Sequence, residues 1–139
     1  MNTQKLTTPT TMRRTFMEGQ ILKRSETSFV RFEECSFAEC DLAYAKFDSC
    51  AFVGCSFSGA NLASAKFVNC RFVNCEFLGA NFYSCEIDES LLIGCSFFGA
   101  NGDYVFCGKE TFFYECLYLE RLTCSPFFEC AGAKYKLDQ

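Results

Sequence analysis

Large apolar residues recur at every fifth position along most of this chain. From Phe32 to Phe97, fourteen consecutive positions of this frame hold Phe, Leu or Ile. A smaller residue, most often Cys or Ala, lies two positions before each of them. A period of five fits neither the 3.6-residue turn of an α-helix nor the two-residue alternation of a β-strand. The pattern therefore predicts short extended segments that each end in a corner.

Four such segments would close a square coil, so the sequence should also repeat at every fourth pentapeptide. Residues 40–59 and 60–79 are identical at 11 of 20 aligned positions, and residues 80–99 keep the apolar frame. Gly59, Gly79 and Gly99 recur with this longer period, which suits corners that need a positive φ. The repeat predicts a solenoid of stacked, four-sided coils with the frame residues inside.

A second motif, Ala-Asn/Asp-Leu followed by two variable residues, accompanies this frame. It occurs, with variants, at Ala60-Asn61-Leu62, Ala80-Asn81-Phe82, Ala100-Asn101 and Cys40-Asp41-Leu42. On these residues the chain resembles the pentapeptide-repeat family. The resemblance implies an all-β solenoid, a right-handed quadrilateral β-helix of about five 20-residue coils with N- and C-terminal caps.

The regularity of the repeat divides the chain into three parts. We expect a flexible N-terminal segment and cap at residues 1–19 and a regular pentapeptide-repeat β-helix at 20–102. An irregular last coil and C-terminal cap should follow at 103–139, with a short helix around 115–122. Within the regular part, Asp41, Asn61, Asn81 and Asn101 form a polar column. We expect their side chains to hydrogen-bond along the stack or to local backbone rather than to bind a ligand.

Cysteine is unusually frequent, with 12 residues in 139. Nine of them occupy the smaller position of the frame, so we interpret them as packing residues. A column of cysteines lacks the four converging ligands of structural zinc. The N-terminal sequence has no apolar run typical of a signal peptide, and no stretch approaches the 18 apolar residues of a membrane span. We therefore expect reduced thiols, a cytoplasmic location, no membrane association, no metal and no cofactor.

Histidine is absent from the sequence. Its absence removes the Ser-His-Asp and Cys-His pairs used in nucleophilic catalysis. The sequence also contains no glycine-rich phosphate loop outside the coil period and no pair of carboxylates at a meaningful spacing. We therefore expect a non-enzymatic protein-interaction module.

Charge is unevenly distributed along the chain. Residues 1–34 contain six basic and four acidic residues, whereas residues 35–139 contain seven and thirteen. We predict an acidic partner-binding face formed by Glu76, Glu86, Asp88, Glu89 and Asp103, although a merely solvated face is the simpler interpretation. The family resemblance suggests an acidic duplex-DNA mimic. Such a mimic would bind no nucleic acid itself and would inhibit a DNA-handling bacterial protein, such as DNA gyrase or a CRISPR-type surveillance complex.

The number of charges argues against simple mimicry of duplex DNA. Five coils about 4.8 Å apart form a rod of roughly 24 Å, and duplex DNA of that length carries about fourteen charges. The excess of six acidic residues over 35–139 is less than half of this. Mimicry would need one strongly acidic face or a dimer.

Outward apolar residues suggest an alternative function. Val53, Val73 and Ile93 form a stripe, with Leu78 and Phe98 near it and Phe112 and Phe113 in the irregular last coil. Tyr114, Tyr118, Phe127 and Phe128 extend this last group into a predicted self-association surface. Such a stripe indicates contact with a homodimer partner, with another protein or with the chain's own tail. The alternative is therefore a structural scaffold or secreted effector that recruits a protein through this stripe or through its N-terminal tail.

Overall fold

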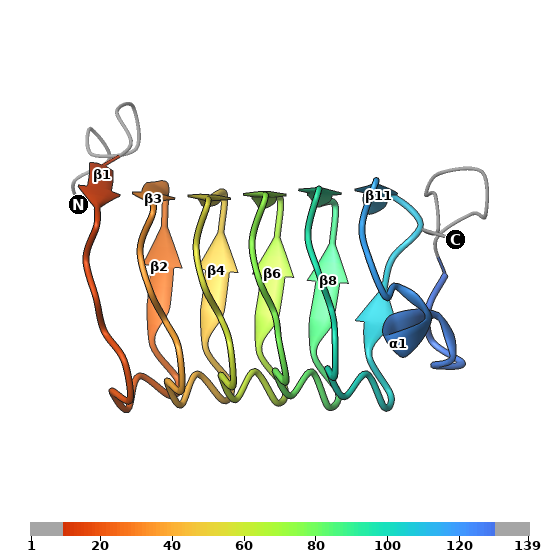
Figure 1. Ribbon diagram of the computed structural model, residues 1–139. Helices are drawn as coiled ribbons and strands as arrows, with labels where there is room; N and C mark the ends of the chain where they lie inside the picture. The colour runs from red at the N-terminus through yellow and green to blue at the C-terminus, as the bar shows by residue number, and fades with distance from the viewer. Residues whose placement is uncertain (1–9, 130–139) are drawn as a thin grey trace.

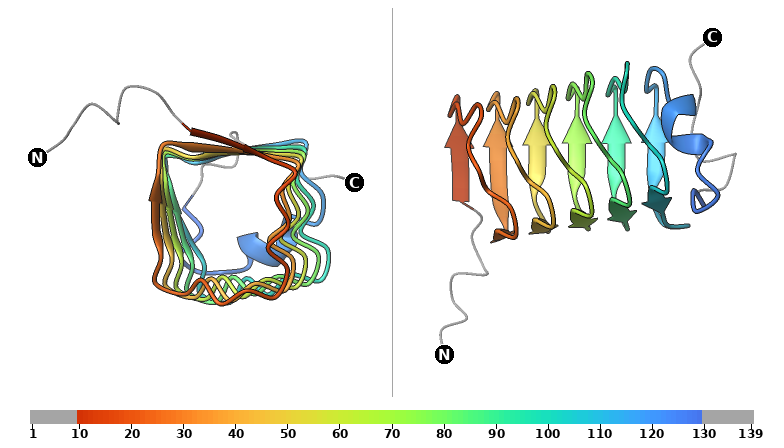
Figure 2. Two further views of the ribbon diagram at one scale, coloured as in Figure 1. Left: turned by 90° about the vertical axis from the view of Figure 1, so that its left-hand side faces the viewer. Right: turned by 90° about the horizontal axis from the view of Figure 1, so that it is seen from below.

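The chain winds into a parallel β-solenoid with a square cross-section (Figures 1 and 2). This computed structural model describes residues 10–129. About five coils stack along one axis, and each coil has four faces joined by corners. The predicted all-β quadrilateral solenoid is confirmed.

Two of the four faces are regular parallel sheets. The six-stranded face is ordered β1 (Thr10–Arg13), β3 (Val30–Glu33), β5 (Ala51–Val53), β7 (Arg71–Val73), β9 (Leu91–Ile93) and β11 (Phe112–Tyr114). The five-stranded face consists of β2 (Glu26–Ser28), β4 (Lys46–Asp48), β6 (Lys66–Val68), β8 (Glu86–Asp88) and β10 (Phe106–Cys107).

Single β-bridges hold the other two faces. The serine face is bridged through Ser36, Ser56, Glu76 and Ser96, and the asparagine face through Asp41, Asn61, Asn81 and Asn101. Along the chain the faces follow one another in the order six-stranded, serine, asparagine, five-stranded. The serine face is therefore opposite the five-stranded face (Figure 2).

The core is built from the predicted frame residues. All fourteen large residues from Phe32 to Phe97 are at most 5% exposed, and the smaller residues from Cys35 to Cys95 are at most 3% exposed. Each strand pairs with the equivalent strand of the next coil, which places like side chains above one another. The rings of Phe32 and Phe52 stack at 5.0 Å with an interplanar angle of 7°, and Phe52 stacks with Phe72 at 4.8 Å and 9°.

The corners require a left-handed backbone. Every fifth residue from Arg14 to Tyr104 has a positive φ. Gly59, Gly79 and Gly99 are among them, with φ of 67°, 65° and 71°, as predicted. Most of the other corner residues carry a side chain, including Tyr44, and this conformation costs such residues roughly 1–2 kcal/mol each. The stacking of the coils therefore determines the corner geometry.

The solenoid begins earlier than the sequence analysis expected. β1 pairs with β3 in the register Thr10↔Val30, and Met12 and Met17 pack against the core in the large frame positions. Residues 10–19, assigned to a flexible segment and cap, thus belong to a coil, because the five-residue frame continues upstream with Met in place of Phe. Residues 1–9 and 130–139 lie outside the described residues.

The C-terminal end departs from the regular coil period by a single insertion. Phe106 pairs with Glu86, 20 residues earlier, as in the preceding coils. Phe112 pairs with Leu91, 21 residues earlier, so the last coil contains one extra residue. The extra residue lies in the corner between β10 and β11. Helix α1 (Glu120–Thr123) follows, starting at residue 120 rather than at the predicted 115.

Helix α1 closes this end of the core (Figure 1). Gly102 stands in the large frame position after Phe97, and a Cβ there would collide with the carbonyl oxygen of Arg121 and lie 3.0 Å from Leu122 Cδ2. Leu119 and Leu122 are fully buried. The missing side chain of Gly102 therefore provides the space that α1 fills.

Candidate functional site

The five predicted acidic residues lie on three faces of the solenoid. Glu86 and Asp88 belong to β8, and Glu89 occupies the following corner, so these three lie together on the five-stranded face. Glu76 lies on the opposite serine face, and Asp103 follows Asn101 on the asparagine face. The separation arises because two corners lie between Glu76 and Glu86, which turns their side chains in opposite directions.

Basic residues interrupt the acidic character of the five-stranded face. Lys66 is in register with Glu86, and its Nζ lies 4.0 Å from Glu86 Oε1. Lys46 precedes Lys66 in the same column. Duplex DNA carries one charge per roughly 1.7 Å, or about three per coil at the strand spacing. On this face, of the coils described, the β8 coil with its three carboxylates reaches that density.

The carboxylates of the first coils are paired with arginines. Arg13 Nε lies 2.6 Å from Glu33 Oε1, Arg31 also contacts Glu33, and Arg14 Nε lies 2.8 Å from Glu34 Oε1. Hydrogen bonds from Arg13 and then Arg31 lower the pKa of Glu33. These pairs neutralise the carboxylates near the N-terminal end of the six-stranded face.

The predicted apolar stripe is present on the six-stranded face. Val53, Val73 and Ile93 are in register and half-buried, and β11 extends the column with Tyr114, which is 61% exposed. Phe112 is also partly exposed. Phe113, by contrast, is fully buried. Its assignment to a surface stripe was wrong, because side chains alternate along β11 and the extra residue before it changes which one points inward.

The adjoining serine face carries a second apolar group. Leu78 and Phe98 are 47% and 51% exposed, and the Phe98 ring makes an edge contact with Tyr118 at 5.0 Å. Leu117, 40% exposed, bridges to Ser96 on the same face. The sequence predicted Tyr114 and Tyr118 as part of a self-association surface on the last coil, whereas Leu117 was missed. Its place beside Tyr118 in the shifted frame is the signal that could have found it. We call these residues together the apolar surface: Val73, Leu78, Ile93, Phe98, Tyr114, Leu117 and Tyr118.

The polar column on the asparagine face is structural, as predicted. Asn61 Nδ2 donates to Asp41 Oδ1 at 3.3 Å, Asn81 donates to Asn61 at 3.3 Å, and Asn101 donates to Asn81 at 3.1 Å. Each side-chain oxygen also accepts a backbone N–H two positions later, such as that of Ala63 at 3.1 Å. The column thus bonds each coil to the next.

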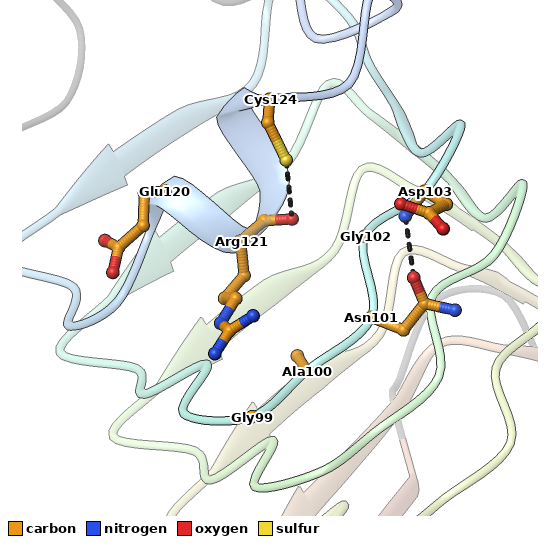
Figure 3. A pocket seen from close by; sticks show the side chains of 8 residues that line it. All are labelled: Gly99, Ala100, Asn101, Gly102, Asp103, Glu120, Arg121 and Cys124. Carbon is orange, nitrogen blue, oxygen red and sulfur yellow. Dashed lines mark hydrogen bonds between the residues drawn. The ribbon is translucent and has the colours of Figure 1, made fainter.

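A polar hollow of about 420 Å³ lies where α1 meets the asparagine face (Figure 3). Its polar groups make local bonds: the N–H of Asp103 donates to Asn101 Oδ1 at 3.0 Å, and the Cys124 thiol lies 3.7 Å from the carbonyl oxygen of Arg121. Its lining consists of Gly99, Ala100, Asn101, Gly102, Asp103, Glu120, Arg121 and Cys124. These residues contain no nucleophile–base pair.

The cysteines of residues 10–129 form no disulfide with one another, and all of them except Cys124 are buried. Burial raises the pKa of Cys85 and of Cys95. Within residues 10–129, no three or more His, Cys, Asp or Glu side chains converge as metal ligands do. The same residues contain no helix with the length and apolar character needed to cross a bilayer.

The family follows from the repeat itself. The model of the pentapeptide repeat region matches residues 25–101, more than half of the chain. The chain belongs to the pentapeptide repeat family. No curated protein matches it.

One solved pentapeptide repeat protein shares the fold of this chain, and two further solved structures match it more weakly. The first, from the Arabidopsis thaliana thylakoid lumen, is 23% identical with a TM-score of 0.55, and the match covers 64% of this chain and 66%, just under two thirds, of that one. A protein from the cyanobacterium Cyanothece 51142 is 14% identical over 73% of this chain and 89% of its own, with a TM-score of 0.34. QnrB1, a plasmid-mediated fluoroquinolone resistance protein, is 12% identical over 94% and 92%, with a TM-score of 0.29.

Two groups of outward side chains stand out on the described part of this pentapeptide repeat protein. One is the apolar surface on the six-stranded and serine faces. The other is the group of three carboxylates, Glu86, Asp88 and Glu89, on the five-stranded face.

Proposed function

We propose that this pentapeptide repeat protein is a non-enzymatic interaction module that binds a protein partner through its apolar surface. The main support is a change in residue type along two columns of outward side chains. The column of Leu78 and Phe98 begins with Glu18, Ala38 and Ser58, and the column of Ile93 and Tyr114 begins with Arg13 and Glu33. In these two columns, exposed aromatic and aliphatic side chains therefore gather over the last coils, whereas the first coils carry small or charged residues; the exposed Phe16 and Ile21 of the first coil lie in other columns.

Exposed apolar groups of this kind usually mark a contact surface. Aromatic residues such as Phe98, Tyr114 and Tyr118 supply most of the binding energy in many interfaces. Since the interior of the solenoid is filled by its own frame residues, a protein partner must contact outward side chains. We place this binding in the cytoplasm, whose reducing conditions suit the free thiols.

The test compares two surface variants of the full chain in affinity capture. Phe98→Ser with Tyr114→Ser removes two exposed anchors, and Phe16→Ser with Ile21→Ser removes two exposed apolar residues, 65% and 75% exposed, from the first coil. We expect the first pair to lose a protein that wild type and the second pair retain. Equal retention by both pairs contradicts the proposal. Light scattering of the purified chain identifies a second copy as the partner if the dimer is lost with the first pair alone.

Duplex-DNA mimicry is the second candidate, and one observation favours it. Glu86, Asp88 and Glu89 give the β8 coil three carboxylates on one face, which matches the charge density of DNA over that coil. A target such as DNA gyrase or a CRISPR-type surveillance complex would meet this group in its DNA-binding channel.

Charge reversal tests the mimic directly. We expect wild type to compete with duplex DNA for the target, with an affinity that falls as salt rises. Replacing Glu86, Asp88 and Glu89 by Lys should abolish competition, whereas Glu76→Lys on the opposite face should leave it largely intact. Competition that persists after the triple reversal contradicts mimicry by this face.

A further inference from the structure

Five cysteines from successive coils form one continuous column inside the solenoid. It lies where the six-stranded face turns into the serine face, and each member is at most 2% exposed. The β-bridges from Ser36 through Ser56, Glu76 and Ser96 to Leu117 hold these coils in register, so the thiols occupy equivalent positions above one another in neighbouring coils. We call this set the cysteine column: Cys35, Cys55, Cys75, Cys95 and Cys116.

Packing alone does not require sulfur at these positions. The equivalent small positions of the next column are filled by Ala60, Ala80 and Ala100, which are equally buried. A coil of this size therefore accepts alanine two positions before its large residue.

Hydrogen bonding does not require sulfur either. Cys75 donates to the carbonyl oxygen of Phe52 at 3.3 Å, and the other members of the column make similar bonds. In the column before this one, Ser90 and Thr111 donate from hydroxyl groups at 2.8 and 3.2 Å. The property that distinguishes the cysteine column from both neighbours is an unbroken series of soft sulfur ligands.

The spacing of the coils suits one coordination geometry. Parallel strands lie about 4.7–4.9 Å apart. Two metal–thiolate bonds of about 2.3 Å, arranged in line, span about 4.6 Å. We propose that the cysteine column binds a soft divalent d10 cation, for which Hg(II) is the model, with each ion held linearly between thiolates of two adjacent coils. Linear coordination needs two ligands, so it is compatible with the lack of any larger ligand group in residues 10–129.

Charge balance favours a divalent ion. Binding breaks two S–H bonds, forms two S–metal bonds and releases two protons to solvent, with no change of oxidation state. The product is neutral, so no net charge is buried. A monovalent soft ion such as Cu(I) would leave one negative charge in the core. Five thiols supply two separate adjacent pairs, so the column holds at most two ions in this way.

The test uses the reduced full chain with Cys124→Ser, which removes the exposed thiol of residues 10–129, and with Cys130→Ser. Adding Cys55→Ala and Cys95→Ala leaves every remaining thiol of the column two coils from the next. The matched control adds Cys40→Ala and Cys85→Ala, which removes two buried thiols from other columns, where Ala also occurs. Hg(II) is supplied together with a competing small thiol. Three quantities are measured: the number of bound ions per chain, the number of sulfur atoms around each ion, and the far-UV circular dichroism spectrum.

We expect the control to bind as much Hg(II) as its parent, with two sulfur neighbours per ion. In both proteins the far-UV spectrum should match that of the metal-free protein, and the Tm should be higher than without metal. The Cys55/Cys95 variant should bind about two ions fewer. The separate pair Cys50 and Cys70, which occupy equivalent positions in adjacent coils, keeps its own site. Zn(II) should not bind stoichiometrically. Equal uptake by both variants, or uptake that requires loss of the folded spectrum, overturns the proposal. If the alanine variant does not fold, Cys55→Ser with Cys95→Ser retains the hydroxyl hydrogen bonds and gives the same test.

Discussion

Replacing Phe57 with alanine tests the stacked aromatic core. Phe57 is fully buried. Its ring stacks with Phe37 at 4.9 Å and with Phe77 at 5.0 Å, and it makes edge contacts with Phe52 at 5.3 Å and Phe72 at 6.2 Å. The substitution therefore removes a ring with aromatic neighbours in its own coil and in both adjacent coils.

The magnitude follows from the rigidity of the surroundings. A buried Phe→Ala substitution costs about 3–5 kcal/mol, and more when the cavity cannot collapse. Backbone hydrogen bonds such as that from Phe57 N to the Glu76 carbonyl oxygen, at 2.7 Å, fix the distance between coils. We therefore expect a loss of about 4–5 kcal/mol, a large share of the roughly 5–15 kcal/mol typical of a domain.

Urea unfolding followed by far-UV circular dichroism under reducing conditions measures this loss. The control is Phe98→Ala, whose side chain is 51% exposed and has an edge contact with Tyr118. We expect the control to lose about 1 kcal/mol. The m-value should not change in either variant. Equal losses for the two variants, or a loss below about 2 kcal/mol for Phe57→Ala, would refute the reasoning.

Three further predictions concern the cap, the polar column and pH. Gly102→Ala should displace α1 by collision with its backbone and expose Leu122, so limited proteolysis should cut near residues 120–124 faster while the far-UV spectrum stays largely unchanged. Asn61→Ala should lower the free energy of unfolding by about 1–3 kcal/mol, measured in urea, because it leaves side-chain and backbone partners unpaired. Because Arg13 and Arg31 lower the pKa of Glu33, its stabilisation is present above its unfolded pKa of about 4.3 and is lost as pH falls through the lower folded pKa. Arg13→Gln should therefore flatten the fall of Tm between pH 5 and 3; an unchanged slope contradicts this.

The regular interior could be predicted residue by residue because one physical rule governs it. A four-sided coil puts a large and a smaller residue inside every five positions, so Phe57 and Cys75 could be assigned without the structure. The same rule extends to Met12 and Met17 in the first coil, where the polar threonines around them obscured the frame.

Surface neighbours were harder to predict than core residues. Glu76 and Glu86 lie close to each other in the sequence, but the two corners between them place them on opposite faces of the solenoid. Phe113 was misassigned because a single extra residue before β11 exchanges inward and outward positions. The sequence shows that the strict frame is lost after residue 102, but the position of the extra residue, between β10 and β11, depends on how the coils pair.

The division of each pentapeptide into two inward and three outward positions separates selection for folding from selection for recognition. An outward side chain such as Phe98 meets mainly the equivalent outward positions of the coils above and below it. One column can therefore change its chemistry over generations while the other columns and the core keep theirs. A library that randomises a single outward column should thus retain the fold in most of its members, and the rod offers several such columns for independent variation.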